Sequence, residues 1–225
     1  MRNRNKKANG RKQKGFFWIT TGLLLIAAAL LLAAYNLYDD LRAEQSSGQV
    51  ISQLKEALHR KDAAEVSESP SGEQEWVVSE EKSDFPDYVL CPDMEMPVET
   101  ISGSDYIGVL EIPALGLSLP VFSEWSYPGL KIAPCRYSGS AYQKNLIICG
   151  HNYTSHFGNL KKLSEGDIAT FTDMNGNVFT YKMTERETLQ PFSTEEMESG
   201  DWDLTLFTCT IGGQSRVTVR FELEF

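Results

Sequence analysis

The sequence predicts a mainly-β fold, a closed β-barrel with a few short helices, preceded by one transmembrane helix. The barrel is predicted by the many short apolar or alternating runs of the C-terminal half, which are separated by turn signals. The transmembrane helix is predicted by residues 16–38, a run without a single charge that is long enough to span a bilayer. A composition of 41% hydrophobic and 11% aromatic residues over 225 positions agrees with one anchored globular domain.

The N-terminal region predicts a signal-anchor. Residues 1–15 carry seven Lys and Arg and no acid, whereas Asp39-Asp40 follow the uncharged run. Because cations favour the cytoplasmic side, we expect 1–15 to be a cytoplasmic tail, 16–38 a single membrane pass and the rest of the chain extracellular. A cleaved signal peptide is the alternative, since Ala33-Ala34 offer small residues, but its apolar core usually has only about 7–15 residues.

The charge distribution argues against a nucleic-acid partner. The net charge is −10, and the N-terminal tail holds seven of the 21 Lys and Arg. The other 14 stand against all 31 Asp and Glu, a formal −17. Phosphate binding needs a basic surface, so the body of the protein is not expected to bind nucleic acid.

Residues 39–84 are predicted to form an acidic stalk or linker. Apolar residues at weak helical spacing favour a helix up to about Val66, and the low hydrophobicity of 67–82 is typical of a linker. His59 lies between charged neighbours and is expected to be a solvated helix residue.

Residues 105–225 are expected to contain the barrel. Strands are predicted at 106–113, 117–122, 145–149, 168–172, 178–188, 204–209 and 215–224, and short helices near 127–132, 157–163 and 193–199.

The last two strands place a thiol next to a guanidinium. The first is a short apolar run that ends at Cys209, and the second alternates strictly from Arg216 onward. The Gly212-Gly213 pair between them is a turn signal, so both residues are expected at the same end of the sheet. Nearby positive charge lowers a thiol pKa, which favours a reactive rather than a buried, inert cysteine. Arg220 shares the strand face of Arg216 and is the competing cation.

A histidine occupies a comparable position. His151 directly follows the apolar run 145–149 and Gly150, so it too lies at a strand end. A thiol nucleophile, an imidazole acid/base and a cation for an oxyanion are together sufficient for acyl transfer. His156, in the loop that follows, is expected to be a solvated bystander.

These residues carry a family resemblance. Residues 205–209, Thr-Leu-Phe-Thr-Cys, fit the TLxTC pattern of sortases, Gly150-His151 fits the histidine position of that family, and Arg216 fits its arginine at the start of the last strand. Further landmarks lie at 157–163, 166–167 and 180–181. The region from about 106 to 225 therefore resembles the sortases, with the subclass open among B-, C- and D-like.

The resemblance implies a closed eight-stranded barrel and a membrane-anchored cysteine transpeptidase of the Gram-positive cell surface. Cys209 would attack the Thr–Gly amide of an LPxTG-like sorting signal on a surface protein or pilin. His151 would exchange protons with the leaving and incoming amines, and Arg216 would hold the oxyanion. The acceptor would be a peptidoglycan precursor or a pilin lysine. Thr208 and Asn152 are expected to contact substrate.

Residues 85–104 have two interpretations. Three prolines and two methionines favour an extended segment packed on the outside of the barrel. Some sortases that build pili instead carry an N-terminal lid with an Asp-Pro-aromatic motif over the cysteine. This chain has Pro92-Asp93-Met94, which departs from that motif.

No cofactor is expected. The short paired Cys/His spacings of a metal site do not occur in the sequence. Acidic loops could hold calcium, as in some sortases, but no motif supports it. Cys149 is expected to be a core residue, and Cys91 and Cys135 could pair in an oxidising compartment.

Other cysteine enzymes fit less well. Papain-like proteases have the cysteine before the histidine, and cysteine L,D-transpeptidases need a Ser-His-Gly-Cys sequence. The non-enzymatic alternative is a catalytically inactive, sortase-like module anchored at the surface for binding or structure.

Overall fold

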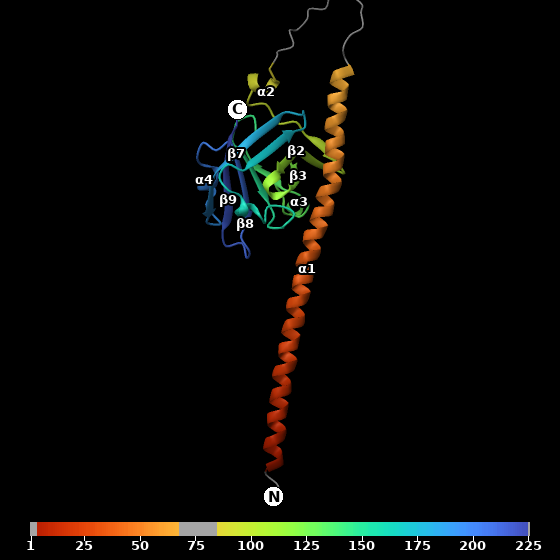
Figure 1. The fold of residues 1–225 in the computed structure, drawn as a ribbon, viewed down its shortest axis with the longest axis vertical. Helices are drawn as coiled ribbons and strands as arrows, with labels where there is room; N and C mark the ends of the chain where they lie inside the picture. The colour runs from red at the N-terminus through yellow and green to blue at the C-terminus, as the bar shows by residue number, and fades with distance from the viewer. Residues whose placement is uncertain (1–3, 68–84, 225) are drawn as a thin grey trace, which may run out of the picture. The chain divides into compact units, whose positions relative to one another are not determined.

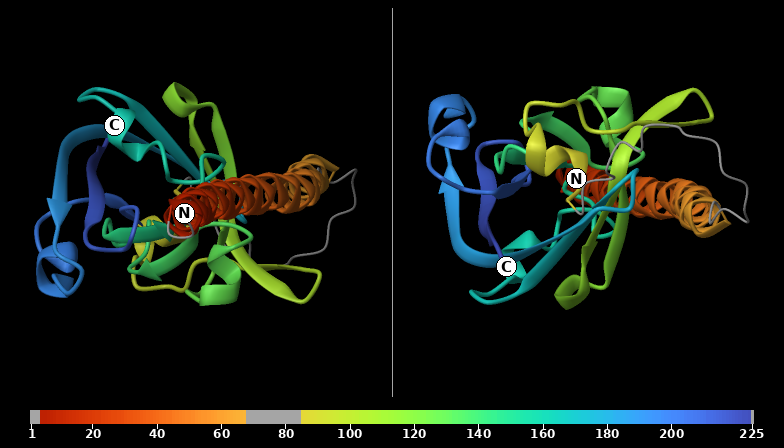
Figure 2. Two further views of the ribbon diagram at one scale, coloured as in Figure 1. Left: turned by 90° about the horizontal axis from the view of Figure 1, so that it is seen from below. Right: turned by 90° about the horizontal axis from the view of Figure 1, so that it is seen from above.

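The second half of the chain folds into a β-barrel (Figure 1, Figure 2). The computed structural model describes residues 4–67 and 85–224, with side chains for 16–61 and 85–224. The chain divides into two compact units, Met1–Leu41 and Arg42–Phe225. The strands are β1 (Glu99–Ile101), β2 (Ser104–Ile112), β3 (Leu117–Phe122), β4 (Cys135–Ser138), β5 (Leu146–Gly150), β6 (Ile168–Asp173), β7 (Val178–Leu189), β8 (Leu204–Cys209) and β9 (Arg216–Leu223).

Eight of these strands close the barrel in the order β2-β3-β4-β5-β8-β9-β7-β6. β6 pairs back with β2 in antiparallel register, from Gly108 opposite Asp173 to Glu111 opposite Thr170. The pairs β3–β4 and β5–β8 are parallel, and β1 adds a short strand to one end of β2. The predicted closed eight-stranded barrel is therefore confirmed, with mixed strand directions.

Alternation along the strands fills the barrel interior. On β8 and β9, Leu204, Leu206, Val219 and Phe221 are fully buried in the main core. Successive side chains of a strand point to opposite faces. The intervening positions, among them Cys209, therefore lie on the outer face of the barrel.

The helices outside the barrel are short, apart from the first. They are α1 (Arg4–Ser67), α2 (Asp87–Leu90), α3 (Tyr127–Leu130) and α4 (Thr194–Glu198), with 3-10 turns at Pro113–Leu115 and Leu160–Lys162. The helix expected over 157–163 is thus a single 3-10 turn. At α3 the Ser126 hydroxyl accepts a hydrogen bond from the Gly129 amide at 3.0 Å and so caps the N-terminus of the helix.

Residues 42–61 of α1 pack on the outer face of the barrel. Leu54 is fully buried there, and Val50, Ile51 and Leu58 pack against the same residues. We call this group the outer cluster. Its barrel members are Ile101, Tyr106, Val109, Phe122, Ala133, Cys135, Cys149 and Met174.

The predicted stalk is thus partly integral to the domain. The helical stripe of apolar residues, weak in the sequence, is sufficient to bury one face once an apolar surface lies opposite. Polar contacts add to this packing, because Lys61 Nζ donates to the Met174 carbonyl oxygen at 2.7 Å. His59 is exposed, as expected. The rest of the predicted linker, residues 68–84, lies outside the described residues.

Residues 85–104 also pack on the domain. The Tyr88 ring stacks on that of Tyr142 with centroids 4.7 Å apart, and Met96 is buried in the main core. Gln143 donates to the Asp93 carboxylate at 3.1 Å. This segment therefore fastens itself to the barrel by aromatic and methionine side chains.

The first unit contains the uncharged run. Its apolar side chains from Phe16 to Tyr38 are exposed in the helix. Within the described part of the chain, one helix is long and apolar enough to cross a membrane. The first three residues of the basic tail lie outside the described residues.

Candidate active site

Cys209 and Arg216 lie directly opposite each other at the turn end of the β8–β9 hairpin. The turn between them is closed by the Thr210 amide, which donates to the Ser215 carbonyl oxygen at 2.9 Å. Gly212 and Gly213 have φ angles of 84° and 71°, a region that favours glycine, so the Gly-Gly pair is needed for this tight return. Cys209 is exposed. The predicted juxtaposition of thiol and guanidinium is therefore present in the structure.

The Arg216 guanidinium is oriented by the turn. Its Nη1 donates to the carbonyl oxygens of Gly213 and Ser215, at 3.1 and 3.2 Å. The side chain is half-buried and lines a cavity together with Cys209. A guanidinium fixed in this way presents its remaining N–H groups in a defined plane, which suits recognition of a carbonyl oxygen or an oxyanion.

This cavity, which we call the Cys209 cavity, has a volume of about 200 Å³. One wall is mainly aromatic and apolar, formed by Trp125, Tyr127, Leu130, Tyr137 and Phe207. Trp125 packs edge-on against Tyr127, and Tyr137 against Phe207, with centroids 4.9 and 5.3 Å apart. A second part of the lining belongs to residues 190–203, the β7–β8 connection, through Gln190, Pro191, Ser193, Thr194 and Met197. None of residues 85–104 lines it, so this described segment does not act as a lid here.

His151 comes beside Cys209 through strand register. β5 and β8 are parallel, with Gly150 opposite Thr208. His151 and Cys209 are the residues that follow this pair along the chain, and neighbouring strands lie about 4.8 Å apart. The His151 ring stacks on Tyr153, with centroids 4.1 Å apart and parallel planes. His151, Cys209 and Arg216 thus gather at one end of three adjacent strands. The residues of β5 that line the cavity are Cys149 and Gly150, and the imidazole is not part of the lining.

Gly150 has a packing reason to precede the histidine. A Cβ atom at this position would lie 2.5 Å from the Phe157 ring, which is fully buried in the main core. The intervening loop folds back onto itself, because the Tyr153 carbonyl oxygen accepts from the amides of His156 and Gly158, at 3.1 and 2.8 Å. Close approach of Phe157 to the end of β5 therefore shapes the loop that carries His151.

His156 is not the solvated bystander that the sequence predicts. It is fully buried, and its Nε2 lies 3.3 Å from the Ser47 hydroxyl of α1. That hydroxyl donates to the Ile132 carbonyl oxygen at 2.6 Å. The Tyr153 ring lies between the two histidines, 5.5 Å from His156. His156 thus connects helix α1 to the loop of His151.

The two predicted substrate contacts differ in their surroundings. Thr208 is 3% exposed, and the alternation that turns Cys209 outward turns Thr208 into the barrel. Its side chain does not line the Cys209 cavity, and its contact with substrate stays a prediction. Asn152 is half-buried in the loop after His151 and is also not a lining residue.

All four cysteines are free thiols, so Cys91 and Cys135 do not pair. Cys135 and Cys149 lie opposite each other on β4 and β5, both buried. Burial raises the pKa of the Cys135 thiol to about 11, and burial is also the main cause that raises the pKa of Cys149. Cys149 is therefore the core residue that the sequence predicts. Among the described residues, no His, Cys, Asp and Glu gather into a metal-binding group.

The sequence analysis missed the walls of the cavity. Trp125 and Tyr127 lie just before and at the start of the short helix expected near 127–132, and two aromatic side chains close together there were the available signal. Of the two arginines on the outer face of β9, Arg216 lines the cavity and Arg220 is buried elsewhere.

Comparisons with known proteins agree with this arrangement. Residues 110–224, about half of the chain, match the family model of the sortase domain. Similar solved structures include sortase C from Streptococcus pneumoniae (22% identity, 79% of this chain and 94% of that chain, TM-score 0.48). They also include a sortase D5 transpeptidase from Clostridium perfringens (22%, 62% and 88%, 0.49) and sortase E from Streptomyces avermitilis (27%, 53% and 88%, 0.46).

No curated protein matches the chain. The TM-scores of these three structures lie below 0.5, so membership rests on the match to the family model. That match confirms the predicted family and leaves the subclass open. The roles of Cys209, His151 and Arg216 stay predictions. The chain belongs to the sortase family of cysteine transpeptidases.

Proposed function

We propose that the protein cleaves an LPxTG-like sorting signal and transfers it to an amine. The observation that carries this proposal is the cross-strand pair of Cys209 and Arg216, with His151 at the end of the parallel neighbour of β8. The aromatic wall of the Cys209 cavity suits the apolar Leu and Pro of such a signal.

In the first half-reaction the Cys209 thiolate attacks the Thr carbonyl carbon. Arg216 donates to the oxyanion of the tetrahedral intermediate. The C–N bond to Gly then breaks, and the imidazolium of His151 gives its proton to the leaving amine. The product is a thioester between Cys209 and the Thr carbonyl, with the C-terminal peptide released.

In the second half-reaction an amine attacks the thioester. Neutral His151 accepts a proton from that amine, the C–S bond breaks, and Cys209 leaves as a thiolate. The acceptor is a peptidoglycan-precursor amine or a pilin lysine, and the chemistry is the same for both. Without an acceptor, water would give slow hydrolysis.

The test uses the full chain in detergent, a quenched fluorescent LPxTG-like peptide and mass spectrometry of the products. Cys209→Ala should leave less than about 1% of wild-type cleavage, because the covalent route is lost. Cys91→Ala, which removes the other exposed thiol, should leave the rate unchanged. Cleavage by Cys209→Ala would contradict the proposal. Wild type that binds the peptide without forming a thioester would favour the non-enzymatic module.

The other two residues have matched tests. His151→Ala should lower the rate about 10²–10⁴-fold, whereas His59→Ala, on the exposed face of α1, should not. Arg216→Lys keeps the charge but loses the planar fork, so we expect about a 10²–10³-fold loss. A near-normal Arg216→Lys rate would mean that charge alone is sufficient.

We further propose that residues 1–15 are cytoplasmic and the catalytic domain extracellular. The seven cations before the uncharged run support this orientation. The proposed substrates, sorting signals and cell-wall amines, lie on the extracellular side of the membrane, which also supports it. Protease added to intact protoplasts should remove the domain and spare the tail. A mature N-terminus near Tyr35 would instead show a cleaved signal peptide, and it would leave the catalytic proposal untouched.

A further inference from the structure

Arg220 is a buried cation outside the reacting groups. It is 1% exposed and heads the fully buried side chains by volume. It lies on the outer face of β9, opposite Thr205 of β8, and does not line the Cys209 cavity. Removing a guanidinium from water is costly unless its N–H groups donate to acceptors in the protein. The groups around Arg220 must therefore supply these acceptors.

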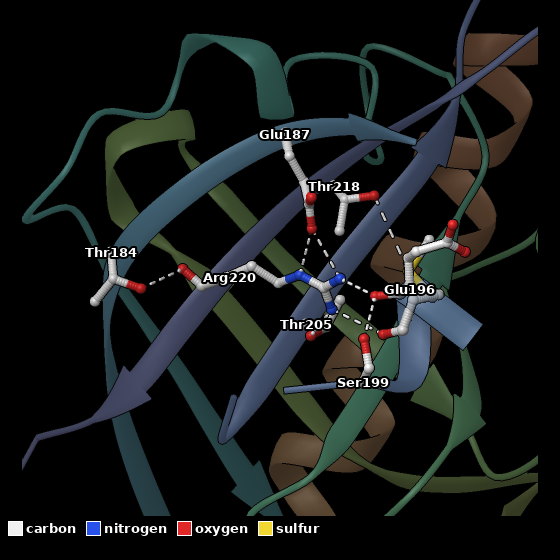
Figure 3. A network of polar contacts seen from close by, with 8 residues as sticks. Thr184, Glu187, Glu196, Ser199, Thr205, Thr218 and Arg220 are labelled. Atoms are coloured by element: carbon white, nitrogen blue, oxygen red, sulfur yellow. Dashed lines mark hydrogen bonds and ion pairs between the residues drawn. The ribbon is translucent and has the colours of Figure 1, made fainter. Parts of the chain in front are cut away.

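Every donor nitrogen of Arg220 is engaged (Figure 3). Nε and Nη2 both contact Glu187 Oε1 of β7, each at 2.8 Å. Nη1 donates to the Thr205 hydroxyl at 2.9 Å. The other two contacts reach α4, from Nη1 to the Met197 carbonyl oxygen at 2.8 Å and from Nη2 to that of Glu196 at 2.6 Å. These contacts match the five N–H groups of a guanidinium.

The segment held in this way has little stability of its own. α4 has five residues, and no side-chain hydrogen bond caps its N-terminus. Helices so short are not stable alone, and the carbonyl groups of a last turn have no partner within the helix. Arg220 supplies both the partners and the favourable charge at this C-terminal end. Met197 is buried below it, 4.0 Å from the Thr218 hydroxyl.

The same segment forms one wall of the Cys209 cavity. Gln190, Pro191, Ser193, Thr194 and Met197 all line it, and Met197 is also bound by Arg220 through its carbonyl oxygen. Arg220 thus connects Glu187 of β7 and Thr205 of β8 to a surface that a substrate would contact. β8 also carries Cys209, so the wall is fixed relative to the nucleophile.

We propose that Arg220 and Glu187 are positioning residues that hold the β7–β8 connection as the binding wall for the sorting peptide. Neither side chain lines the cavity. We call the contacts of Arg220 with Glu187, Thr205 and α4 the clamp. Loss of the clamp would let the wall move, which weakens peptide binding while the thiol, imidazole and Arg216 stay in place. The inference about binding rests on the proposed function, whereas the inference about the wall does not.

The test compares Arg220→Lys with Arg186→Lys in the full chain. Arg186 lies on the same strand as Glu187 and binds the carbonyl oxygens of Lys161 and Leu163, which do not line the cavity. Arg220→Lys keeps the charge but cannot bind α4, Thr205 and Glu187 together. We expect its KM for the peptide to rise about tenfold or more, with kcat changed by less than about threefold. Arg186→Lys should leave KM unchanged.

The partner residue gives a rescue series. Glu187→Gln keeps an oxygen acceptor and should raise KM less than Glu187→Ala. The rate at which iodoacetamide alkylates Cys209 should stay at the wild-type value in all of these variants, because the small reagent does not need the wall. An unchanged KM in Arg220→Lys would overturn the proposal, and so would a fall in kcat and alkylation together, which indicates damage to the whole site.

Hydrogen exchange supplies a readout that is independent of catalysis. In Arg220→Lys the amides of 193–199 should exchange at least about tenfold faster, because local opening becomes easier, while those of β8 stay protected. Protection of 193–199 equal to wild type would overturn the proposal even if KM changes. Absence of peptide cleavage by the wild type would contradict the proposed function, and the exchange result would still decide the role of the clamp.

Discussion

Two segments cover the outer face of the barrel, and they are held in opposite ways. Residues 42–61 of α1 bury Leu54 and its neighbours against the outer cluster, and their polar contacts come from separate side chains along the helix, Ser47, Lys55 and Lys61. The β7–β8 connection is held by one buried guanidinium with five contacts. Apolar burial is proportional to area and not directional, whereas hydrogen bonds fix distances and angles.

This difference assigns different tasks to the two covers. Apolar burial stabilises the domain even if the helix shifts slightly on the barrel, because this burial is not directional. The connection lines the Cys209 cavity, where its position should affect peptide binding. Burying the Arg220 guanidinium costs desolvation free energy, and its hydrogen bonds fix the position of the connection. Changes in the helix should therefore alter stability, and changes in the clamp should alter peptide affinity.

The largest expected effect is that of removing the helix. Fully burying one Leu is worth about 1.5–3 kcal/mol, and three further apolar residues pack beside Leu54, so loss of the helix should cost more than about 4 kcal/mol. Urea unfolding of 42–225 and 85–225 measures this difference. A fragment of 62–225 keeps the acidic segment without the packed residues and should resemble 85–225. Equal stability of all three would mean that the helix does not cover the outer cluster in solution.

A single substitution tests the same packing without removing chain. Leu54→Ala should lower the free energy of unfolding by about 2–5 kcal/mol, as large-to-small changes in a core do. Gln53→Ala, next to it on the exposed face, is the control. Peptide KM measured well below the melting temperature should not change. A raised KM in Leu54→Ala would remove the distinction between the two covers.

The thiols of the outer cluster make its stability sensitive to alkaline pH. Burial raises the pKa of Cys135 from 9.0 to about 11. Between these values the unfolded chain loses the proton while the folded chain keeps it, so the free energy of unfolding falls as pH rises through that window. Urea midpoints from about pH 8 to about pH 11 should show a weaker decline in Cys135→Ala than in Cys91→Ala.

Local patterns in the sequence were sufficient for much of this structure. Period-2 alternation located the strands, and the Gly-Gly turn placed Cys209 opposite Arg216. The inward direction of Thr208 also followed from alternation and could have been predicted. Contacts between distant residues could not. His156 is buried through a partner 109 residues earlier in the chain, and the stripe around Leu54 acquires meaning only once the apolar outer face exists.

The position of Arg220 shows the same limit at the site. The strand pattern placed it on the face of Arg216, which made the two equivalent candidates for the oxyanion. They differ only in what covers that face, because α4 and Glu187 bury one and leave the other at the cavity. The burial of Arg220 depends on the β7–β8 connection, whose sequence has no strand or helix periodicity that would predict its position.

The smallest expected effect concerns the exposed ion pair between α1 and the barrel. Lys55 Nζ lies 2.9 Å from the Glu111 carboxylate, and both side chains are more than 40% exposed. Exposed pairs are worth about 0–1 kcal/mol and are screened by salt. Lys55→Gln should therefore lower the free energy of unfolding by less than about 1 kcal/mol, and less again at high salt.

The contribution of the Lys55–Glu111 pair to the free energy of unfolding should decrease at acidic pH. The hydrogen bond from Lys55 is the main cause that lowers the pKa of Glu111 below 4.5. The contribution of the pair is therefore present above pH 4.5 and is lost as pH falls through the lowered pKa in the folded state. Wild type and Lys55→Gln should converge in urea midpoint there, with Lys55→Gln in 1 M salt as the screened reference. A loss well above about 1 kcal/mol at neutral pH would mean that charge, and not the burial of Leu54, holds the helix on the barrel.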